Sequence, residues 1–425
     1  MAMDASLTAR LLRLVGPNIM PRVWGDALQS GQNDPVQLCH SLLTARGQAS
    51  GIAIADEVLN LLDAADDAAL SRYFEALRDD FEVDVSAVVA AAQAARTGGP
   101  QEWKALQLAA EAPRQEVFRR LNAAPGGTAR LVAMRARLLK AVRNDASLAP
   151  IDSDLRHLLR SWFNRGFLVP ARIDWNTSAA ILEKIIAYEA VHAIDDWDAL
   201  RERLAPADRR CFSFFHPAMP DEPLIFVEVA LTKGLPGSIQ DILQTPRPIL
   251  NPAQADTAIF YSISNCQAGL AGISFGAFLI KQVASDLQAE LPNLKTYSTL
   301  SPVPGFAAWL TAEGIEPDPV GAQAPSIAEL AAEYLLNAKT DGGLPLDPVA
   351  RFHLGNGAVL HRINAEGDTS ARGRAQSHGV MVNYLYELDK VETRHEAFAA
   401  GGELAASRQV RGLASRRRTA RAEPR

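Results

Sequence analysis

A glycine-rich stretch, NCQAGLAGISFG, spans residues 265–276 and is the part of the sequence best suited to bind a ligand. Its three glycines, Gly269, Gly272 and Gly276, let the backbone approach a bound molecule without a Cβ in the way. The residues that follow carry apolar side chains at helical spacing. A glycine loop that leads into a helix N-terminus presents free N–H groups to a phosphate or pyrophosphate. The pattern therefore favours an anionic, cofactor-like substrate.

Two other interpretations of this loop stay open. It matches neither GxxxxGKS/T nor GxGxxG, so its glycines could serve only the packing of a tight turn. It also contains a formal GxSxG centred on Ser274, the nucleophile-elbow pattern of α/β-hydrolases. An elbow needs a strand that runs almost directly into the first glycine, whereas the apolar run TAIFYSIS ends at Ser264, well before Gly272. The hydrolase interpretation is therefore disfavoured.

The elements around the loop change in character along the chain. Residues 1–167 show apolar side chains every three or four positions, with breaks at 98–100 and 125–127, and predict a helical domain for scaffolding or oligomerisation. Residues 168–395 contain strand-like runs such as LIFVEVAL and TAIFYSIS between helical segments, and predict an α+β or α/β catalytic domain. Residues 396–425 are basic and are expected to form a disordered end.

Composition narrows the class of protein. The chain has 425 residues, is 48% apolar and carries a net charge of −6, which argues against bulk nucleic-acid binding. We expect neither a membrane span nor a secretory signal. The three cysteines, Cys39, Cys211 and Cys266, are widely separated, so a metal cluster or a disulfide framework is not expected. A reducing, cytoplasmic location is the expectation.

Four segments of the second half resemble, in order and with similar gaps, the blocks of the malonyl-CoA decarboxylase family: CFSFFHPAMPDEPLIFVEVALT, AIFYSISNCQAGLAGISFGAFLIKQV, YSTLSPVPGFAAWL and HLGNGAVLHRIN. The similarity covers most of residues 160–390. It implies an α-helical N-terminal domain plus an α+β, GNAT-like (acetyltransferase-fold) catalytic domain. GNAT-like proteins hold the CoA pyrophosphate on a glycine loop between a strand and a helix N-terminus, which agrees with the geometry inferred above from residue types.

Carried over residue by residue, the resemblance assigns malonyl-CoA contacts to Ala268, Gly269, Leu270, Ala271, Gly272, Ile273 and Ser274. It places the catalytic, substrate-binding serine at Ser298 and the catalytic, substrate-binding histidine at His353, and Ser301 stays open as the alternative serine. We expect His353 to act as an acid and Ser298 to be its hydrogen-bonding partner and proton acceptor.

The implied reaction is decarboxylation of malonyl-CoA to acetyl-CoA and CO2. The thioester is itself the electron sink, so we expect neither a metal nor an added cofactor. Expected partners are malonyl-CoA, acetyl-CoA and further copies of the chain in a dimer or tetramer, but neither nucleic acid nor a membrane. An acyl-CoA-dependent acyltransferase on the same core and a non-enzymatic CoA-binding regulator remain alternatives.

Other polar residues receive local interpretations. Charge alone suggests that Arg372 and Arg374 contact CoA phosphates. His216 lies between aromatic residues and prolines and is expected to order a turn. Glu189 and His192 follow a helical segment, where capping or dipole contacts explain them.

Overall fold

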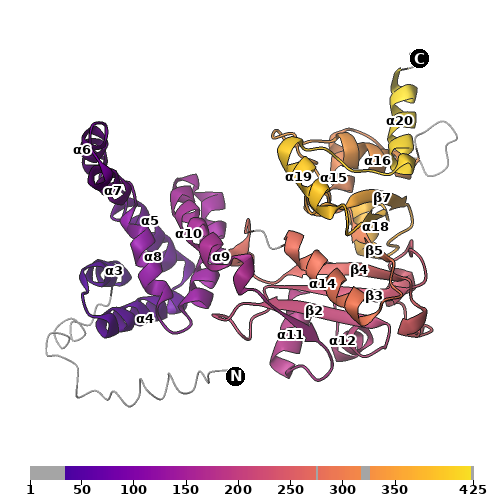
Figure 1. Ribbon diagram of the computed structural model, residues 1–425, viewed down its shortest axis with the longest axis horizontal. Helices are drawn as coiled ribbons and strands as arrows, with labels where there is room; N and C mark the ends of the chain where they lie inside the picture. Colours follow the sequence, from indigo (N-terminus) through magenta and orange to yellow (C-terminus); the bar gives the residue numbers. More distant parts are fainter. Residues whose placement is uncertain (1–33, 274–275, 317–325, 423–425) are drawn as a thin grey trace. The chain divides into compact units, whose positions relative to one another are not determined.

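The computed structural model describes residues 34–273, 276–316 and 326–422, and it divides into two compact units, Met1–Leu158 and Leu159–Arg425. We call them the helical unit and the sheet unit (Figure 1). Ser274, one of the predicted substrate contacts, lies outside the described residues.

The helical unit contains helices alone within its described part. They are α3 (Pro35–Thr44), α4 (Gln48–Ala64), α5 (Asp67–Asp79), α6 (Val85–Ala95), α7 (Pro100–Ala109), α8 (Pro113–Asn122), α9 (Gly127–Asn144) and the first part of α10 (Ala149–Trp162). Local sequence sets their ends, since Asp66 and Asp84 cap α5 and α6 through backbone N–H groups. Both breaks expected from glycine and proline separate helices, so the predicted helical region is confirmed.

The sheet unit is built on one eight-stranded sheet in the order β1-β2-β3-β4-β5-β8-β6, with β7 paired to β8. The strands are β1 (Val169–Ile173), β2 (Arg209–Phe215), β3 (Ile225–Thr232), β4 (Thr257–Asn265), β5 (Thr296–Thr299), β6 (Ser301–Pro302), β7 (Val359–Asn364) and β8 (Met381–Leu385). β4 and β5 run parallel, and the other pairings are antiparallel. The predicted helical N-terminal region followed by an α+β domain is confirmed, and the GNAT-like assignment stays a prediction.

Helices cover the sheet through apolar stripes. α11 (Ala179–Tyr188) and α12 (Trp197–Leu204) bury Leu182, Ile185 and Leu200 against β1, β2 and β3. α14 (Gly276–Glu290) buries Leu279, Val283 and Leu287, which share one helical face. The strand over TAIFYSIS and the helix after the glycine loop were both expected, and both are confirmed.

β4 and β5 separate partway along their length. Their parallel pairing ends where Phe260 meets Thr299, yet β4 continues to Asn265. The chain after Thr299 leaves β4 but stays beside β8, which pairs with Ser298 through Leu385 and with Ser301 through Val382. The second half of β4 therefore has no β5 residue beside it, and a space opens between the diverging strands.

One further helix, α13 (Gln240–Leu243), precedes β4. The others come after β6 and are α15 (Phe306–Ala312), α16 (Ile327–Asn337), α17 (Pro348–Gly355), α18 (Ala371–Ser377), α19 (Val391–Gly401) and α20 (Arg408–Ala422).

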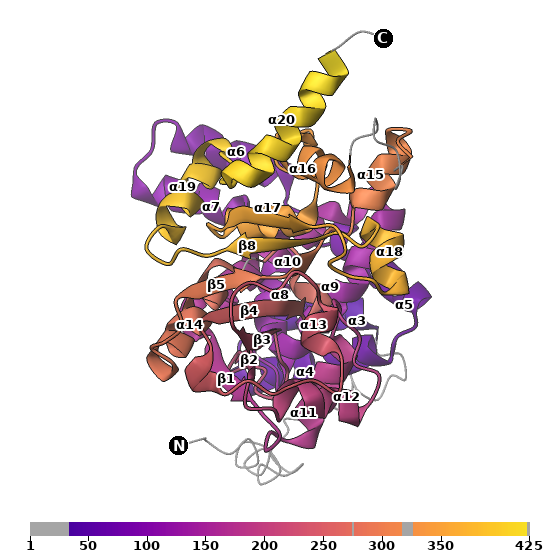
Figure 2. The same cartoon turned by 90° about the vertical axis from the view of Figure 1, so that its right-hand side faces the viewer.

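The predicted disordered tail over 396–425 is wrong up to Ala422. α20 lies beside α16 (Figure 2). Val410 and Ala414, one helical turn apart, are buried there, and the Ser407 N–H donates to the carbonyl oxygen of Leu360.

Candidate active site

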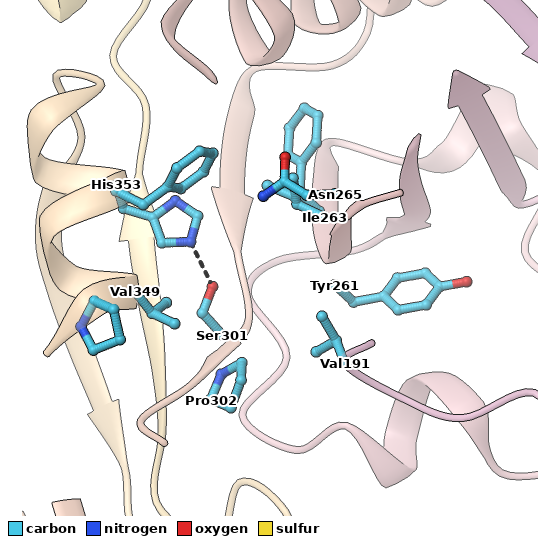
Figure 3. Close-up of a pocket in the computed structure, with 11 residues that line it drawn as sticks. Val191, Tyr261, Ile263, Asn265, Ser301, Pro302, Val349 and His353 are labelled. Atoms are coloured by element: carbon cyan, nitrogen blue, oxygen red, sulfur yellow. Dashed lines mark hydrogen bonds between the residues drawn. The ribbon is translucent and has the colours of Figure 1, made fainter. Parts of the chain in front are cut away.

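A cavity of about 290 Å³ lies where β4 and β5 diverge (Figure 3). Its described lining comes mainly from the second half of β4, which has no β5 partner, from β6 and from one face of α17. These residues are Val191, Phe260, Tyr261, Ile263, Asn265, Ser301, Pro302, Pro348, Val349, Phe352 and His353. None of these lining residues carries a formal charge at neutral pH unless His353 is protonated.

Ser301 and His353 form a hydrogen-bonded pair at this cavity. Ser301 Oγ lies 3.0 Å from His353 Nε2 and donates its own proton to Thr299 Oγ1 at 2.9 Å. Since the serine proton is used in that bond, Ser301 Oγ accepts from Nε2–H. Nδ1 then accepts from the Tyr386 hydroxyl, 2.9 Å away. The network therefore fixes one tautomer of the neutral imidazole.

Local sequence sets the position of His353. Asp347 caps α17 by accepting the Ala350 N–H at 2.8 Å, and Pro348 opens the helix. His353 falls in the last turn of this short helix, where the Tyr384 ring stacks on the imidazole at a centroid distance of 4.5 Å. Tyr384 of β8 is thus stacked on the histidine, and Tyr386, just after β8, is bonded to it.

Burial controls the charge of this histidine. His353 is 4% exposed, and desolvation lowers its pKa from 6.5 to about 3. Burial also raises the pKa of the Tyr386 phenol well above its usual range, so that this hydroxyl stays protonated. Before a ligand enters, the pair is therefore neutral at physiological pH.

The predicted hydrogen bond between Ser298 and His353 is wrong. Ser298 is fully buried in β5, and its hydroxyl donates to the carbonyl oxygens of Tyr384 at 2.9 Å and Thr299 at 3.3 Å. Both ring nitrogens of His353 bond to other residues. The alternative serine, Ser301, takes the expected place three residues further along the same run, which pairs with β8 at Ser298 and again at Ser301.

The predicted binding loop follows the strand that lines the cavity. Ala268–Leu270 form a 3-10 turn, Gly272 has a positive φ of 77°, and α14 begins at Gly276. Gly269, Leu270 and Ile273 are buried, whereas Ala271 and Gly272 are exposed. Gly272 does not directly follow β4, as a nucleophile elbow requires. The ligand contacts expected of this loop stay predictions.

Several other residues named from the sequence have local roles. His216 Nδ1 accepts the Ala218 N–H, and the expected turn is confirmed. Arg374 forms an exposed ion pair with Glu366. Arg372 donates to the carbonyl oxygens of Ala190 and Val191, a role that its sequence did not indicate.

Within the described residues, no group of histidine, cysteine and carboxylate side chains is arranged to hold a metal ion. No helix in the same residues has both the length and the apolar character needed to cross a bilayer.

The fold and the site define an α+β protein in which a glycine loop and a buried serine–histidine pair flank one strand. A family model described as the malonyl-CoA decarboxylase C-terminal domain matches residues 166–320 and 316–423, and one described as the N-terminal domain matches residues 81–163. The chain belongs to the malonyl-CoA decarboxylase family.

Individual relatives agree with this assignment. The chain is 35% identical over 348 residues to a mitochondrial malonyl-CoA decarboxylase of Anser anser anser, covering 70% of this chain and 69% of the relative. It is 34% identical over 346 residues to the mitochondrial enzyme of Rattus norvegicus, covering 70% of each. The crystal structure of malonyl-CoA decarboxylase from Rhodopseudomonas palustris superposes with a TM-score of 0.84 at 50% identity, covering 89% of this chain and 98% of that one. The Agrobacterium vitis structure gives 0.83 at 49%, with 89% and 99% covered.

Proposed function

We propose that this chain is a carboxy-lyase that converts malonyl-CoA to acetyl-CoA and CO2 without an added cofactor. The observation that carries the proposal is the Ser301–His353 pair, which faces a cavity whose described lining has no fixed charge. Membership of the malonyl-CoA decarboxylase family supports the substrate and the reaction.

In this proposal the CoA diphosphate binds the 268–274 loop at the N-terminal end of α14, where free N–H groups and the helix dipole favour an anion. The pantetheine arm then runs along β4 between Phe260 and Asn265. Beyond Phe260 the strand has no β5 partner, and in this proposal the amides of the arm pair with that edge of β4. The thioester and its malonyl group enter the cavity beside Ser301. Support comes from Asn265, which lines the cavity and ends the strand that leads to the loop.

Loss of CO2 breaks the bond between C2 and the carboxylate carbon, and its electron pair becomes the thioester enolate. The described cavity lining offers the carboxylate no lysine or arginine, so its charge is poorly solvated before the reaction. In the enolate that charge spreads over C2 and the thioester oxygen, and the departing CO2 is neutral. The site thus favours the product of the bond cleavage over the bound carboxylate.

His353 supplies the proton that C2 needs. A malonyl carboxylate close to Ser301 brings a negative charge beside the imidazole, which raises the pKa of His353 from about 3 and draws a proton from solvent. Both ring nitrogens then donate, Nε2–H to Ser301 and Nδ1–H to the Tyr386 oxygen. After CO2 leaves, Ser301 gives its hydroxyl proton to C2 and takes the proton from Nε2, which leaves a neutral His353 protonated on Nδ1. Its return to the Nε2–H tautomer completes the cycle. Each turnover consumes one proton.

Incubation of purified protein with malonyl-CoA alone tests this function. We expect one CO2 and one acetyl-CoA for each malonyl-CoA consumed, in the presence of EDTA and with no acceptor. A His353→Gln variant should release no CO2 above background. If malonyl-CoA is consumed only when an amine acceptor is added, decarboxylation is wrong and the acyltransferase alternative holds.

The proposal includes a cytoplasmic, homo-oligomeric protein. Free, buried Cys39, Cys211 and Cys266 suit a reducing compartment, although the goose and rat relatives are named as mitochondrial. On α6 and α7, Val85, Val89, Trp103 and Leu108 expose at least half of their surface and suit contacts between copies of the chain. Light scattering of the purified protein, with a monomer as the contradicting result, tests the assembly.

A further inference from the structure

One wall of the cavity has a different origin from the rest. Among the described lining residues, Val191 alone lies outside β4, β6 and α17. It belongs to the irregular segment between α11 and α12. Figure 3 shows Val191 on the side of the cavity opposite Val349, beside Tyr261. Val191 therefore adds to the cavity a wall residue that belongs to neither a helix nor a strand.

Side chains hold the backbone of this segment in place. Glu189 Oε1 accepts the N–H groups of Val191 at 2.8 Å and His192 at 2.7 Å. From α18, Arg372 donates to the carbonyl oxygens of Ala190 at 2.8 Å and Val191 at 3.2 Å. The backbone groups on both sides of Val191 thus bond to side chains, where a regular element would supply backbone partners.

A second arginine fixes the next residues. Arg203 on α12 donates to the carbonyl oxygens of His192 at 2.7 Å and Ala193 at 2.9 Å. The same guanidinium bonds to Glu228 of β3 at 2.9 Å, and both side chains are buried. Withdrawal of the wall would break both bonds from the buried Arg203 to the backbone and leave part of its hydrogen-bonding capacity unused, which is destabilising. The position of Val191 is therefore fixed by the sheet and by two helices.

We propose that Val191 sets the size limit for the substituent on C2 of the acyl group, and that Glu189, Arg203 and Arg372 are positioning residues that keep it there. The inference rests on the proposed function, because it concerns the acyl group that the cavity would hold. A flexible cavity wall can move to accommodate an extra methyl group, whereas a rigid wall excludes it. One methyl group is worth roughly 10- to 200-fold in discrimination by a well-packed pocket. The wild-type protein should thus prefer malonyl-CoA over methylmalonyl-CoA.

The first test is Val191→Ala, with kcat/KM measured for both thioesters. The ratio of methylmalonyl-CoA to malonyl-CoA should rise by roughly tenfold or more, since the space of two methyl groups opens beside C2. Val169→Ala removes the same atoms from a half-exposed position on β1, and should leave the ratio as in the wild type. If the wild type decarboxylates malonyl-CoA and Val191→Ala leaves the ratio unchanged, the inference about Val191 is overturned and the proposed function stands. A wild type that releases no CO2 from malonyl-CoA would instead overturn the proposed function.

The second test concerns Arg372, one of the residues proposed to position Val191. Arg372 is exposed, so Arg372→Met removes its hydrogen bonds with little risk to folding. The substrate ratio should move in the same direction as in Val191→Ala, and Arg372→Lys should restore part of the wild-type preference. In the double variant Val191→Ala/Arg372→Met the effects should not add, because both act on one wall. A KM raised equally for both substrates, with the ratio unchanged, would assign Arg372 to CoA binding and contradict its positioning role.

Discussion

Ser301 Oγ and His353 Nε2 lie 3.0 Å apart, although 52 residues separate them in the sequence. β8 explains how they meet. It pairs with β6 through Val382 and Ser301, and its end carries the two tyrosines that contact His353. The geometry of the pair therefore depends on the position that β6 takes beside β8. Ser298 pairs with Leu385 of the same strand, but its hydroxyl donates to Tyr384 and does not reach His353.

Ser301→Ala should abolish most of the activity, and Ser298→Ala should not. Loss of the Ser301 hydroxyl interrupts the proton route to C2, so kcat should fall by roughly 10²-fold or more. Ser298 donates to the Tyr384 carbonyl away from the cavity, so its removal should cost about 1 kcal/mol of stability and leave kcat within a few fold. CO2 release and urea unfolding of both variants measure the two effects. Greater loss of kcat in Ser298→Ala than in Ser301→Ala would return the catalytic role to Ser298.

Tyr386→Phe should impair catalysis while it preserves packing. The phenylalanine keeps the ring but removes the hydroxyl that bonds to His353 Nδ1 and selects the Nε2–H tautomer. We expect kcat to fall about tenfold or more, equivalent to roughly 1.4 kcal/mol of barrier. Nitrogen chemical shifts of the imidazole should show a mixed tautomer.

Tyr297→Phe provides the matched control for that variant. Tyr297 is also buried, and its hydroxyl lacks a hydrogen-bond partner in the described part of the structure. Its loss should leave both kcat and the imidazole shifts unchanged. Equal kcat in Tyr386→Phe and Tyr297→Phe would show that the Tyr386 hydroxyl does not orient the histidine.

His353 should make the protein less stable in acid. Its pKa is about 3 in the folded protein and 6.5 in a free histidine. At pH values between these two, the histidine binds a proton in the unfolded chain but not in the folded one. The stabilising contribution is thus complete above pH 6.5 and is lost as the pH falls toward 3. Between pH 7 and pH 5, this one group should remove about 2 kcal/mol from the free energy of unfolding. His353→Gln should lose correspondingly less over that range in urea titrations, and parallel losses in the two proteins would refute the assignment.

Gly272→Ala should weaken substrate binding. Gly272 has a φ of 77°, which an alanine adopts only at a cost of about 1–2 kcal/mol, so the loop that is proposed to hold the diphosphate should shift. KM for malonyl-CoA should rise about tenfold, with a smaller change in kcat. Gly234→Ala is the control, because Gly234 has a φ of 67° and an added Cβ would contact nothing. A similar KM for malonyl-CoA in both variants would show that Gly272 does not contribute to binding of the substrate.

The sequence predicted those features that depend on neighbouring residues. Apolar periodicity located β4 and α14, and glycine–proline clusters located the helix breaks. It could not choose between Ser298 and Ser301, because both pair with β8 and the place of α17, distant in the sequence, decides which hydroxyl reaches His353. The helical end of the chain was missed because the many arginines of α20 obscure the buried pair Val410 and Ala414.

The wall that carries Val191 shows the same limit. Glu189 was explained from its place near a helix end, and its bonds to the following N–H groups agree with a local role. The contact of Arg372 with the Val191 carbonyl spans 181 residues, and no local sequence pattern predicts it. Residues that act through long-range side-chain contacts are therefore the ones that sequence reasoning alone overlooks.

A crystal structure of His353→Gln with malonyl-CoA would test the central claim most directly, because a variant without the proton donor should retain uncleaved substrate. We predict a diphosphate on the 268–274 loop and a malonyl C2 atom within about 3.5 Å of Ser301 Oγ, close enough for proton transfer. A malonyl group that lies outside the cavity, or beside Ser298, would contradict the account.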